Sequence, residues 1–176
     1  MVDLQDLKRA FGRFPTGVTV VTTRNVDGKL YGFTANSFTS VSLKPPLLLV
    51  CPGSQLSSRP IFDSVSHFAV NILAEGQETI SNHFANFKGN RFQDTLWQKD
   101  RYNQPWIEGA AASFSCRTYA RYEAGDHMIL LGEVLDYIQS EQRGLGFLCG
   151  KYFNPSLEKQ SPIKPYPAKL HNVRNC

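Results

Sequence analysis

Short segments rich in β-branched residues recur along this chain, and this recurrence constrains the fold more than any other feature. The segments alternate in polarity or are apolar throughout, turn-forming residues separate them, and they cover residues 17–23, 47–51, 67–73, 111–122, 128–138 and 147–153. Asp27-Gly28, just after the first segment, is a dipeptide typical of hairpin turns. Six or more strands joined mostly by short turns favour a closed or partly closed antiparallel barrel. We therefore expect a mainly β protein with peripheral helices.

Three segments have helical patterns. Residues 4–14 carry apolar side chains at helical spacing, with Asp3 as a candidate N-cap and Pro15 at the end of the pattern. We expect the apolar face of this helix to pack against the rest of the chain. A short helix is predicted at 60–66 and a longer one at 78–87, followed by a polar surface excursion over 88–104 that is placed to cover a site.

Length and charge place the chain among single-domain soluble proteins. Its 176 residues are 41% apolar and 19% charged, which suits one domain over residues 1–155 followed by an extended tail over 156–176. The net charge of +4 resides beyond Glu158, because residues 1–158 carry 15 basic and 15 acidic side chains. A neutral body has no basic stripe, so we expect no nucleic-acid partner.

The cysteines and the hydropathy indicate a cytoplasmic protein. Cys51, Cys116, Cys149 and Cys176 are scattered and form no C-x-x-C pair, which suits free thiols rather than disulfides or a metal site. No apolar run is long enough to cross a bilayer, and the first residues carry no apolar signal core. We expect no membrane partner and no bound metal.

Residues 31–51 have the composition of a binding floor. Small and polar residues, Thr34-Ala35-Asn36-Ser37 and then Ser40 and Ser42, precede a double proline and an apolar run over 47–50 that we expect in the core. Small residues let a ligand approach the backbone, and Asn and Ser supply donors and acceptors for a planar polar ring edge. An ordinary hairpin with polar residues facing water has the same pattern.

A second candidate site lies at Ser57, Ser58 and Arg59. These residues precede Pro60, which a first helical turn tolerates, so they lie at the start of the predicted helix. Backbone N–H groups, two hydroxyls and a guanidinium fork suit a phosphate group. A capped helix with a surface arginine explains the same residues equally well.

Two further clusters carry imidazole groups. Asn82-His83-Phe84 lies within the predicted helix at 78–87, and Gly125-Asp126-His127 lies in a turn predicted at 123–127. Each histidine is also compatible with a purely structural role. The sequence has no G-x-S-x-G, Walker A, H-E-x-x-H or strand-coupled G-x-G-x-x-G motif, so any nucleotide is bound without a Rossmann motif.

Taken together, these motifs resemble the short-chain flavin reductases, the reductase components of two-component flavin-dependent monooxygenases. The resemblance is carried by RFPTGVTVVTT at 13–23, GFTANSFTSVSLKPPLLLVC at 32–51, SSR at 57–59, FAVNIL at 68–73, GDH at 125–127 and GKY at 150–152. It covers roughly residues 4–153. It implies the FMN-binding split β-barrel fold and a homodimer, each subunit binding FMN or FAD and using NADH or NADPH.

The resemblance also implies roles for particular residues. His127 matches the histidine near the nicotinamide and is the implied catalytic residue. The implied cofactor-binding residues are Phe33, Thr34, Ala35, Asn36, Ser37, Ser40 and Cys51 around the ring, Ser57, Ser58 and Arg59 at the phosphate, Asn82, His83 and Phe84 along the ribityl chain or ring, and Lys151 and Tyr152 on the closing strand.

The implied reaction is hydride transfer from nicotinamide C4 to flavin N5, with reduced flavin supplied to a partner monooxygenase. Three alternatives remain open at this point. They are a tight flavin-binding electron carrier that does not use NAD(P)H, a flavin-mediated reductase of another acceptor such as a corrinoid, and a cofactor-free interaction module.

Overall fold

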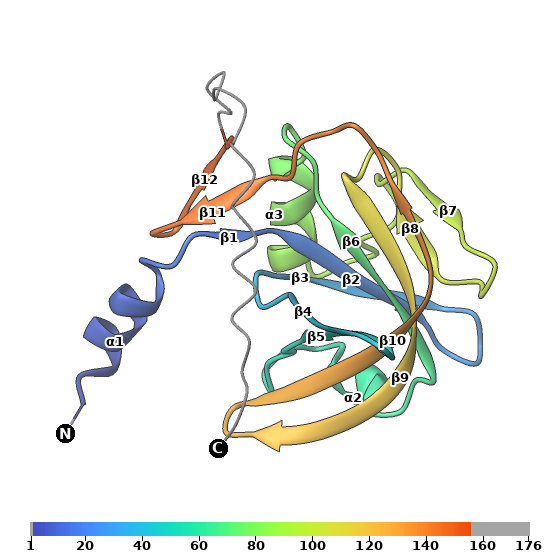
Figure 1. Ribbon diagram of the computed structural model, residues 1–176, viewed down its shortest axis with the longest axis horizontal. Coiled ribbons are helices and arrows are strands. Elements are labelled where there is room, and N and C mark those ends of the chain that lie inside the picture. Colours follow the sequence, from blue (N-terminus) through green and yellow to red (C-terminus); the bar gives the residue numbers. More distant parts are fainter. Residues whose placement is uncertain (1, 156–176) are drawn as a thin grey trace, which may run out of the picture.

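The computed structural model describes residues 2–155, which fold around a seven-stranded antiparallel sheet (Figure 1). Its strands, in spatial order, are β3 (Leu30–Ala35), β2 (Thr19–Arg24), β6 (His67–Ile72), β9 (Ala112–Ala124), β10 (His127–Gln139), β5 (Pro46–Val50) and β4 (Thr39–Leu43). The sheet curls into a split β-barrel. The mainly β architecture with peripheral helices that the sequence predicts is confirmed.

The hairpin of β9 and β10 is the longest element of the barrel, with 13 residues in each strand. Gly125 adopts a φ of 67°, which glycine tolerates better than other residues, and lets the chain reverse within two residues. The turn is shorter than the 123–127 segment predicted from composition. His127 is already the first residue of β10 and pairs with Ala124, so the turn holds it at the rim of the barrel.

Two smaller sheets flank the barrel. One contains β1 (Thr16–Gly17), β11 (Gly146–Leu148) and β12 (Lys151–Phe153), and the other pairs β7 (Trp97–Lys99) with β8 (Pro105–Ile107). The predicted strand at 147–153 is wrong in one respect, because the chain reverses at Cys149 and Gly150, whose φ values are 49° and 78°. Local β-propensity cannot show a hairpin whose turn carries only one glycine.

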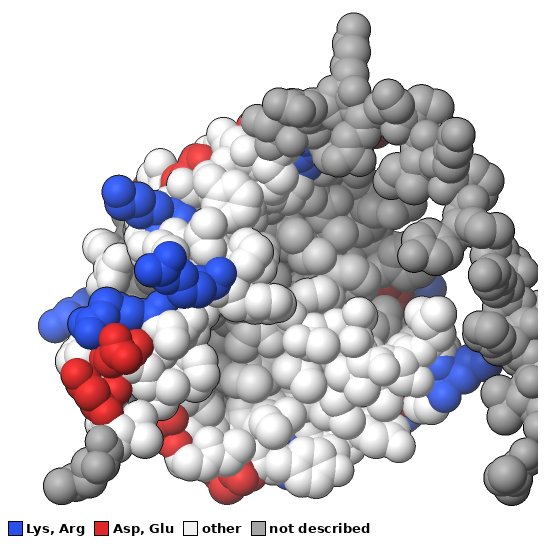
Figure 2. All heavy atoms as spheres, turned by 60° about the vertical axis from the view of Figure 1, so that its left-hand side comes forward, with Lys and Arg blue, Asp and Glu red and all other residues white. Residues whose placement is uncertain are grey.

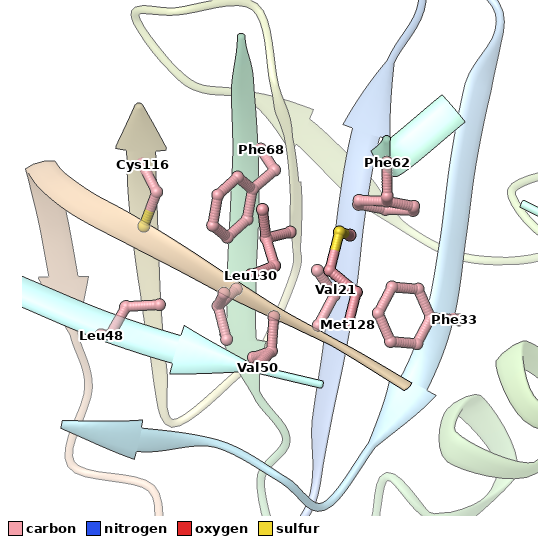
Figure 3. Close-up of a cluster of buried hydrophobic side chains, with 10 residues drawn as sticks. Val21, Phe33, Leu48, Val50, Phe62, Phe68, Cys116, Met128 and Leu130 are labelled. Carbon is pink, nitrogen blue, oxygen red and sulfur yellow. The ribbon is translucent and has the colours of Figure 1, made fainter. Parts of the chain in front are cut away.

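Apolar side chains from opposite walls fill the barrel. In Figure 3, Val21, Phe33, Phe62, Met128 and Leu130 are among the labelled side chains that point toward one another from different strands and a helix. The rings of Phe33 and Phe62 meet edge to face, with their centroids 5.0 Å apart.

Strand β2 separates this barrel core from a second apolar cluster on its outer side. Val21 faces the barrel core and Val20 faces the second cluster, and both are fully buried. Because both faces of β2 are covered, its sequence is nearly free of charge. The apolar run at 47–50 was expected to be buried throughout, but only Leu48 and Val50 are buried, and Leu47 and Leu49 on the other face of β5 are half-buried.

The helices are α1 (Leu4–Phe11), α2 (Arg59–Phe62) and α3 (Glu78–Asn86). The predicted cap is confirmed, because Asp3 accepts hydrogen bonds from the backbone N–H groups of Gln5 and Asp6. The expectation that the apolar face of α1 packs against the chain is wrong. Leu4 and Phe11 are 74% and 71% exposed, and α1 stands away from the barrel (Figure 1). An amphipathic pattern identifies a face that needs a partner, not where the partner is.

Within residues 2–155, no helix is long and apolar enough to span a membrane. The extended tail predicted at 156–176 lies outside the described residues.

Candidate functional site

A cavity of about 870 Å³ opens at the rim of the barrel, where the end of β3 approaches the β9–β10 turn. The segment 34–37 forms one side, the segment 53–56 the next, and the turn with Asp126 and His127 the third. The sequence could not show that these segments meet, because some 90 residues separate the first from the last. Leu56 and Ile129 add apolar surface, so the cavity has both an apolar and a polar lining.

Hydrogen bonds hold the polar side of this cavity in place. Thr34 donates its hydroxyl to the carbonyl of Ser81 at 2.6 Å, which ties the end of β3 to α3. Ser37 accepts the backbone N–H of Cys51 at 2.9 Å, so its own hydroxyl hydrogen stays available to a ligand. Asn36 is exposed at the cavity edge. The segment is therefore a rigid edge with an amide and a hydroxyl presented to the cavity.

His127 lies against Gly53 across the mouth of the cavity. A Cβ at Gly53 would lie 3.4 Å from His127 Nε2, so the imidazole packs directly against the backbone of Gly53. His127 Nδ1 lies 2.7 Å from Asp126 Oδ1, and this hydrogen bond lowers the pKa of the Asp126 carboxyl. A carboxylate partner favours the Nδ1–H form, which leaves Nε2 free on the cavity side.

A second cavity of about 710 Å³ lies beside the first. The two cavities are lined by adjoining segments of the chain, since residues 30–32 and 57–58 line the second and residues 33–37 and 53–56 line the first. Lys29, Lys88 and Arg91 also line the second cavity. Ser58 is 2% exposed, and its hydroxyl has no hydrogen-bond partner among the described residues. A buried, unpartnered hydroxyl beside three cations suits an anionic ligand.

Arg59 does not face either cavity, which corrects its prediction as a phosphate ligand. Its Nε lies 2.6 Å from Asp63 Oδ1, and its Nη2 lies 2.6 Å from Glu123 Oε1. With only 8% of the residue exposed and both edges of the fork paired, the guanidinium is committed within the protein. Asp63 is a local partner at i+4, but Glu123 lies 64 residues away, so local composition gave no sign of the second ion pair.

The residues expected along the ribityl chain gather elsewhere. Phe84 is fully buried beneath β3, where it contacts the backbone position of Gly32, and it cannot touch a ligand. Tyr152 donates its hydroxyl to Asn82 Oδ1 at 2.9 Å, which joins β12 to α3. Within one copy of the chain, neither cavity is lined by Asn82, His83, Phe84, Lys151 or Tyr152.

Two residues that were predicted to contact the flavin ring are also not placed as expected. Ser40 lies exposed on β4 and lines neither cavity. Phe33 borders the first cavity, but its ring is buried in the barrel core, so only its backbone is placed to meet a ligand. Three cations of the second cavity, Lys29, Lys88 and Arg91, were not identified from the sequence as candidate ligands. The available signal was the pair of cations, Lys88 and Arg91, on either side of the polar turn Gly89-Asn90.

Cys51 lines the first cavity as expected, and partial burial raises the pKa of its thiol. A raised pKa leaves less thiolate at neutral pH, so Cys51 reacts slowly with alkylating reagents. In a Cys149→Ser, Cys176→Ser variant, we expect iodoacetamide to label Cys51 several-fold more slowly than it labels the exposed Cys149 in the wild-type protein. Added flavin should slow this labelling further, as measured by peptide mass spectrometry. Labelling of Cys51 that is indifferent to a saturating flavin would place the flavin outside this cavity.

Among the described residues no cluster of three or more His, Cys, Asp or Glu side chains could hold a metal ion. The first cavity instead combines apolar side chains, an exposed amide, a tied hydroxyl and an imidazole, and the second combines cations with an unpartnered hydroxyl. This donor set fits a planar heterocycle that carries a phosphate.

The fold and this two-part site define a flavin reductase-like protein, and the chain belongs to the family of flavin reductase like domains, which it matches over residues 11–156. Among curated relatives, it is 49% identical over 153 residues to the reductase component of the flavin-dependent trigonelline monooxygenase of Acinetobacter baylyi, a match that covers 87% of this chain and 49% of that protein. It is 43% identical over 148 residues, 84% of each protein, to the FMN reductase (NADH) SmoA of Agrobacterium fabrum.

Solved structures give the same result. The NADH:FAD oxidoreductase of Streptomyces globisporus, in complex with NAD and FAD fragments, superposes with a TM-score of 0.82 at 40% identity, over 90% of this chain and 99% of that one. The chain spans about half the length of the first curated relatives it matches.

Proposed function

We propose that this chain is an NAD(P)H:flavin oxidoreductase that supplies reduced flavin to a partner monooxygenase. The observation that carries the proposal is the meeting of segment 34–37 and His127 in one cavity that adjoins a basic one. Relatives are named as reductases of FMN and of FAD that use NADH, and others as reductase components of monooxygenases. We also propose a cytoplasmic location, which the free thiols of Cys51, Cys116 and Cys149 support.

The proposed reaction needs no covalent intermediate with the protein. The bound nucleotide supplies a hydride from nicotinamide C4 to flavin N5, so two planar rings must lie at near contact with water excluded. Asn36 and Ser37 are placed to donate hydrogen bonds to the pyrimidine edge of a flavin, where negative charge develops. His127, held by Asp126, can accept an N–H of the nicotinamide carboxamide at Nε2 and so orient the nucleotide.

The phosphate end of the flavin is proposed to lie in the second cavity. Ser57 and Ser58 keep the role predicted for them, while Lys29 and Lys88 take the place of Arg59 as sources of positive charge. Arg91 donates to the carbonyl of Gly32 at 2.8 Å, and burial lowers its pKa, so it fixes the cavity wall to β3.

Removing both lysines should weaken phosphate binding selectively. In a Lys29→Gln, Lys88→Gln variant we expect the Kd for FMN to rise about tenfold, the scale of two partly exposed charge contacts. Riboflavin, which lacks the phosphate, should bind both proteins equally, as measured by flavin fluorescence quenching. Lys99→Gln removes an exposed lysine of β7 outside this cavity and serves as the control. Equal losses for riboflavin and FMN would contradict the placement of the phosphate.

The proposed activity is tested by mixing the protein with NADH or NADPH and free FMN, FAD or riboflavin while following nucleotide absorbance. Oxidation that requires added flavin is the expected result. A yellow protein inert to both nucleotides would indicate a flavin carrier instead, and a colourless protein that ignores flavin would indicate an interaction module.

We further propose that the chain forms a homodimer, with the apolar face of α1 in the interface. Leu4 on this face and Phe14, just beyond the end of α1, are 74% and 73% exposed, which is unusual for apolar side chains of a lone soluble domain. Figure 2 shows charged side chains gathered at the edge that bears α1, with a broad uncharged area beside them. Phe11 also borders the first cavity, so a second copy seated on α1 would lie next to the site.

Charges placed on this face should separate the subunits. In a Leu4→Glu, Phe14→Glu variant, we expect the dimer dissociation constant to rise at least about 100-fold, because two apolar anchors are lost and two carboxylates must be desolvated. Sedimentation equilibrium measures the change. Val26→Glu alters a fully exposed apolar residue at the β2–β3 turn and should leave the assembly intact. A dimer that tolerates both charges would place the interface elsewhere.

A further inference from the structure

The buried cation Arg59 joins three segments of the chain at one point behind the first cavity. Its guanidinium contacts Asp63 at the end of α2 and Glu123 near the end of β9. Its Nη1 also donates to the carbonyl of Pro52 at 3.4 Å. Pro52 precedes one wall of the cavity, and Glu123 precedes the turn that carries His127. One side chain therefore connects the wall to the turn.

The wall and the turn are also hydrogen-bonded directly to each other. Ser54 donates its backbone N–H to the carbonyl of Asp126 at 2.8 Å, and Met128 donates to the carbonyl of Pro52 at 3.0 Å. The imidazole of His127 rests on Gly53 between these two bonds. A small shift of the turn relative to the wall therefore moves the ring across the mouth of the cavity.

The chemistry of arginine suits this connecting role. A guanidinium is planar and binds partners in fixed directions, whereas an ammonium group on the same site would be a single point charge. A buried cation that loses a carboxylate partner is costly, which favours the paired arrangement. The side chain of Glu123 is 75% exposed, so this contact adds little to global stability and acts mainly on the position of the hairpin end.

We infer that Arg59 is a positioning residue that, through Glu123 and Pro52, fixes the His127 turn against the 52–56 wall and so sets the nicotinamide side of the cavity. The inference rests on the proposed function for its catalytic consequence. Its structural part, a local clamp between the turn and the wall, stands independently of any ligand.

Amide hydrogen exchange in the flavin-free protein tests the clamp directly. In Glu123→Ala we expect the amides of Ser54 and Met128 to exchange about fivefold faster, the scale of losing one partly exposed ion pair. The amide of Leu73, which bonds to Val18 in the other core cluster, should not change. Glu133→Ala breaks the ion pair with Arg117 that joins the same two strands away from the turn, and it should leave all these amides at wild-type rates. Unchanged exchange at Ser54 and Met128 in Glu123→Ala would overturn the inference.

Steady-state kinetics tests the consequence for the reaction. We expect Glu123→Ala to raise the KM for NADH about fivefold while the KM for flavin stays within about twofold, because the phosphate end is untouched. Glu123→Gln keeps a hydrogen-bond acceptor, so its KM for NADH should rise less than that of Glu123→Ala. Arg59→Lys should show no such smaller rise. Equal rises in both KM values would mean that Arg59 only maintains the fold. If the wild-type protein oxidises no nucleotide with any flavin, the proposed function fails, and the exchange measurement alone decides the clamp.

Discussion

Replacing His127 with alanine is expected to lower kcat/KM for NADH about 100-fold while flavin still binds, because the ring is the polar group on the nucleotide side of the cavity. Its side chain is half exposed, so the fold should not suffer. The flavin edge formed by 34–37 and the basic second cavity remain intact in this variant. A loss confined to NADH is the outcome that distinguishes orientation of the nucleotide from a general disturbance of the site.

The measurement varies NADH at saturating flavin and then flavin at saturating NADH. His67→Ala is the matched control, since His67 stacks on Tyr102 with ring centroids 5.8 Å apart and lies outside both cavities. Its kinetic constants should stay near those of the wild-type protein. If His127→Ala leaves the apparent NADH affinity and turnover unchanged, the role given to His127 is wrong.

Replacing Asn71 with leucine is expected to lower the free energy of unfolding by about 3–4 kcal/mol, because several buried groups lose their partners together. Asn71 is fully buried on β6. Its amide nitrogen donates to the carbonyl of Val20 at 3.0 Å, and its amide oxygen accepts from the backbone of Ile107 at 3.0 Å and from Ser113 Oγ at 2.8 Å. Leucine is close in size but satisfies none of these groups, so the cost is electrostatic rather than one of volume.

Urea unfolding followed by tryptophan fluorescence, at one fixed protein concentration, measures this loss. Asn86→Leu, at the exposed end of α3, is the control and should change stability by no more than about 0.5 kcal/mol. A loss below about 1 kcal/mol for Asn71→Leu would mean that the buried groups find other partners.

Local sequence was sufficient for the features that depend on near neighbours. The cap at Asp3, the helix over 78–86 and the long strands on either side of Gly125 are where composition and periodicity place them. Each rests on hydrogen bonds or turn geometry within a few residues, so the local pattern contains the whole cause. The segment 34–37 likewise shows its polar edge in its own composition.

The sequence did not correctly predict the surroundings of residues whose partners are distant in the chain. Arg59 was predicted as a phosphate ligand from its neighbours, yet it pairs with Glu123, which lies 64 residues away. Phe84 follows a polar pair and looked accessible, yet β3 covers it completely. Lys29 and Lys88 meet at one cavity although nothing in their local sequence connects them.

The sequence by itself determined the class of fold, the polar edge at 34–37 and the turn next to His127, because alternation, turn residues and side-chain chemistry are properties of short segments. Only the tertiary structure decided which charged groups face a ligand and which are paired within the protein. The physical reason is that burial and ion pairing depend on contacts between strands far apart in the chain, and the barrel closure that brings β3, the 53–58 segment and the β9–β10 turn together creates those contacts.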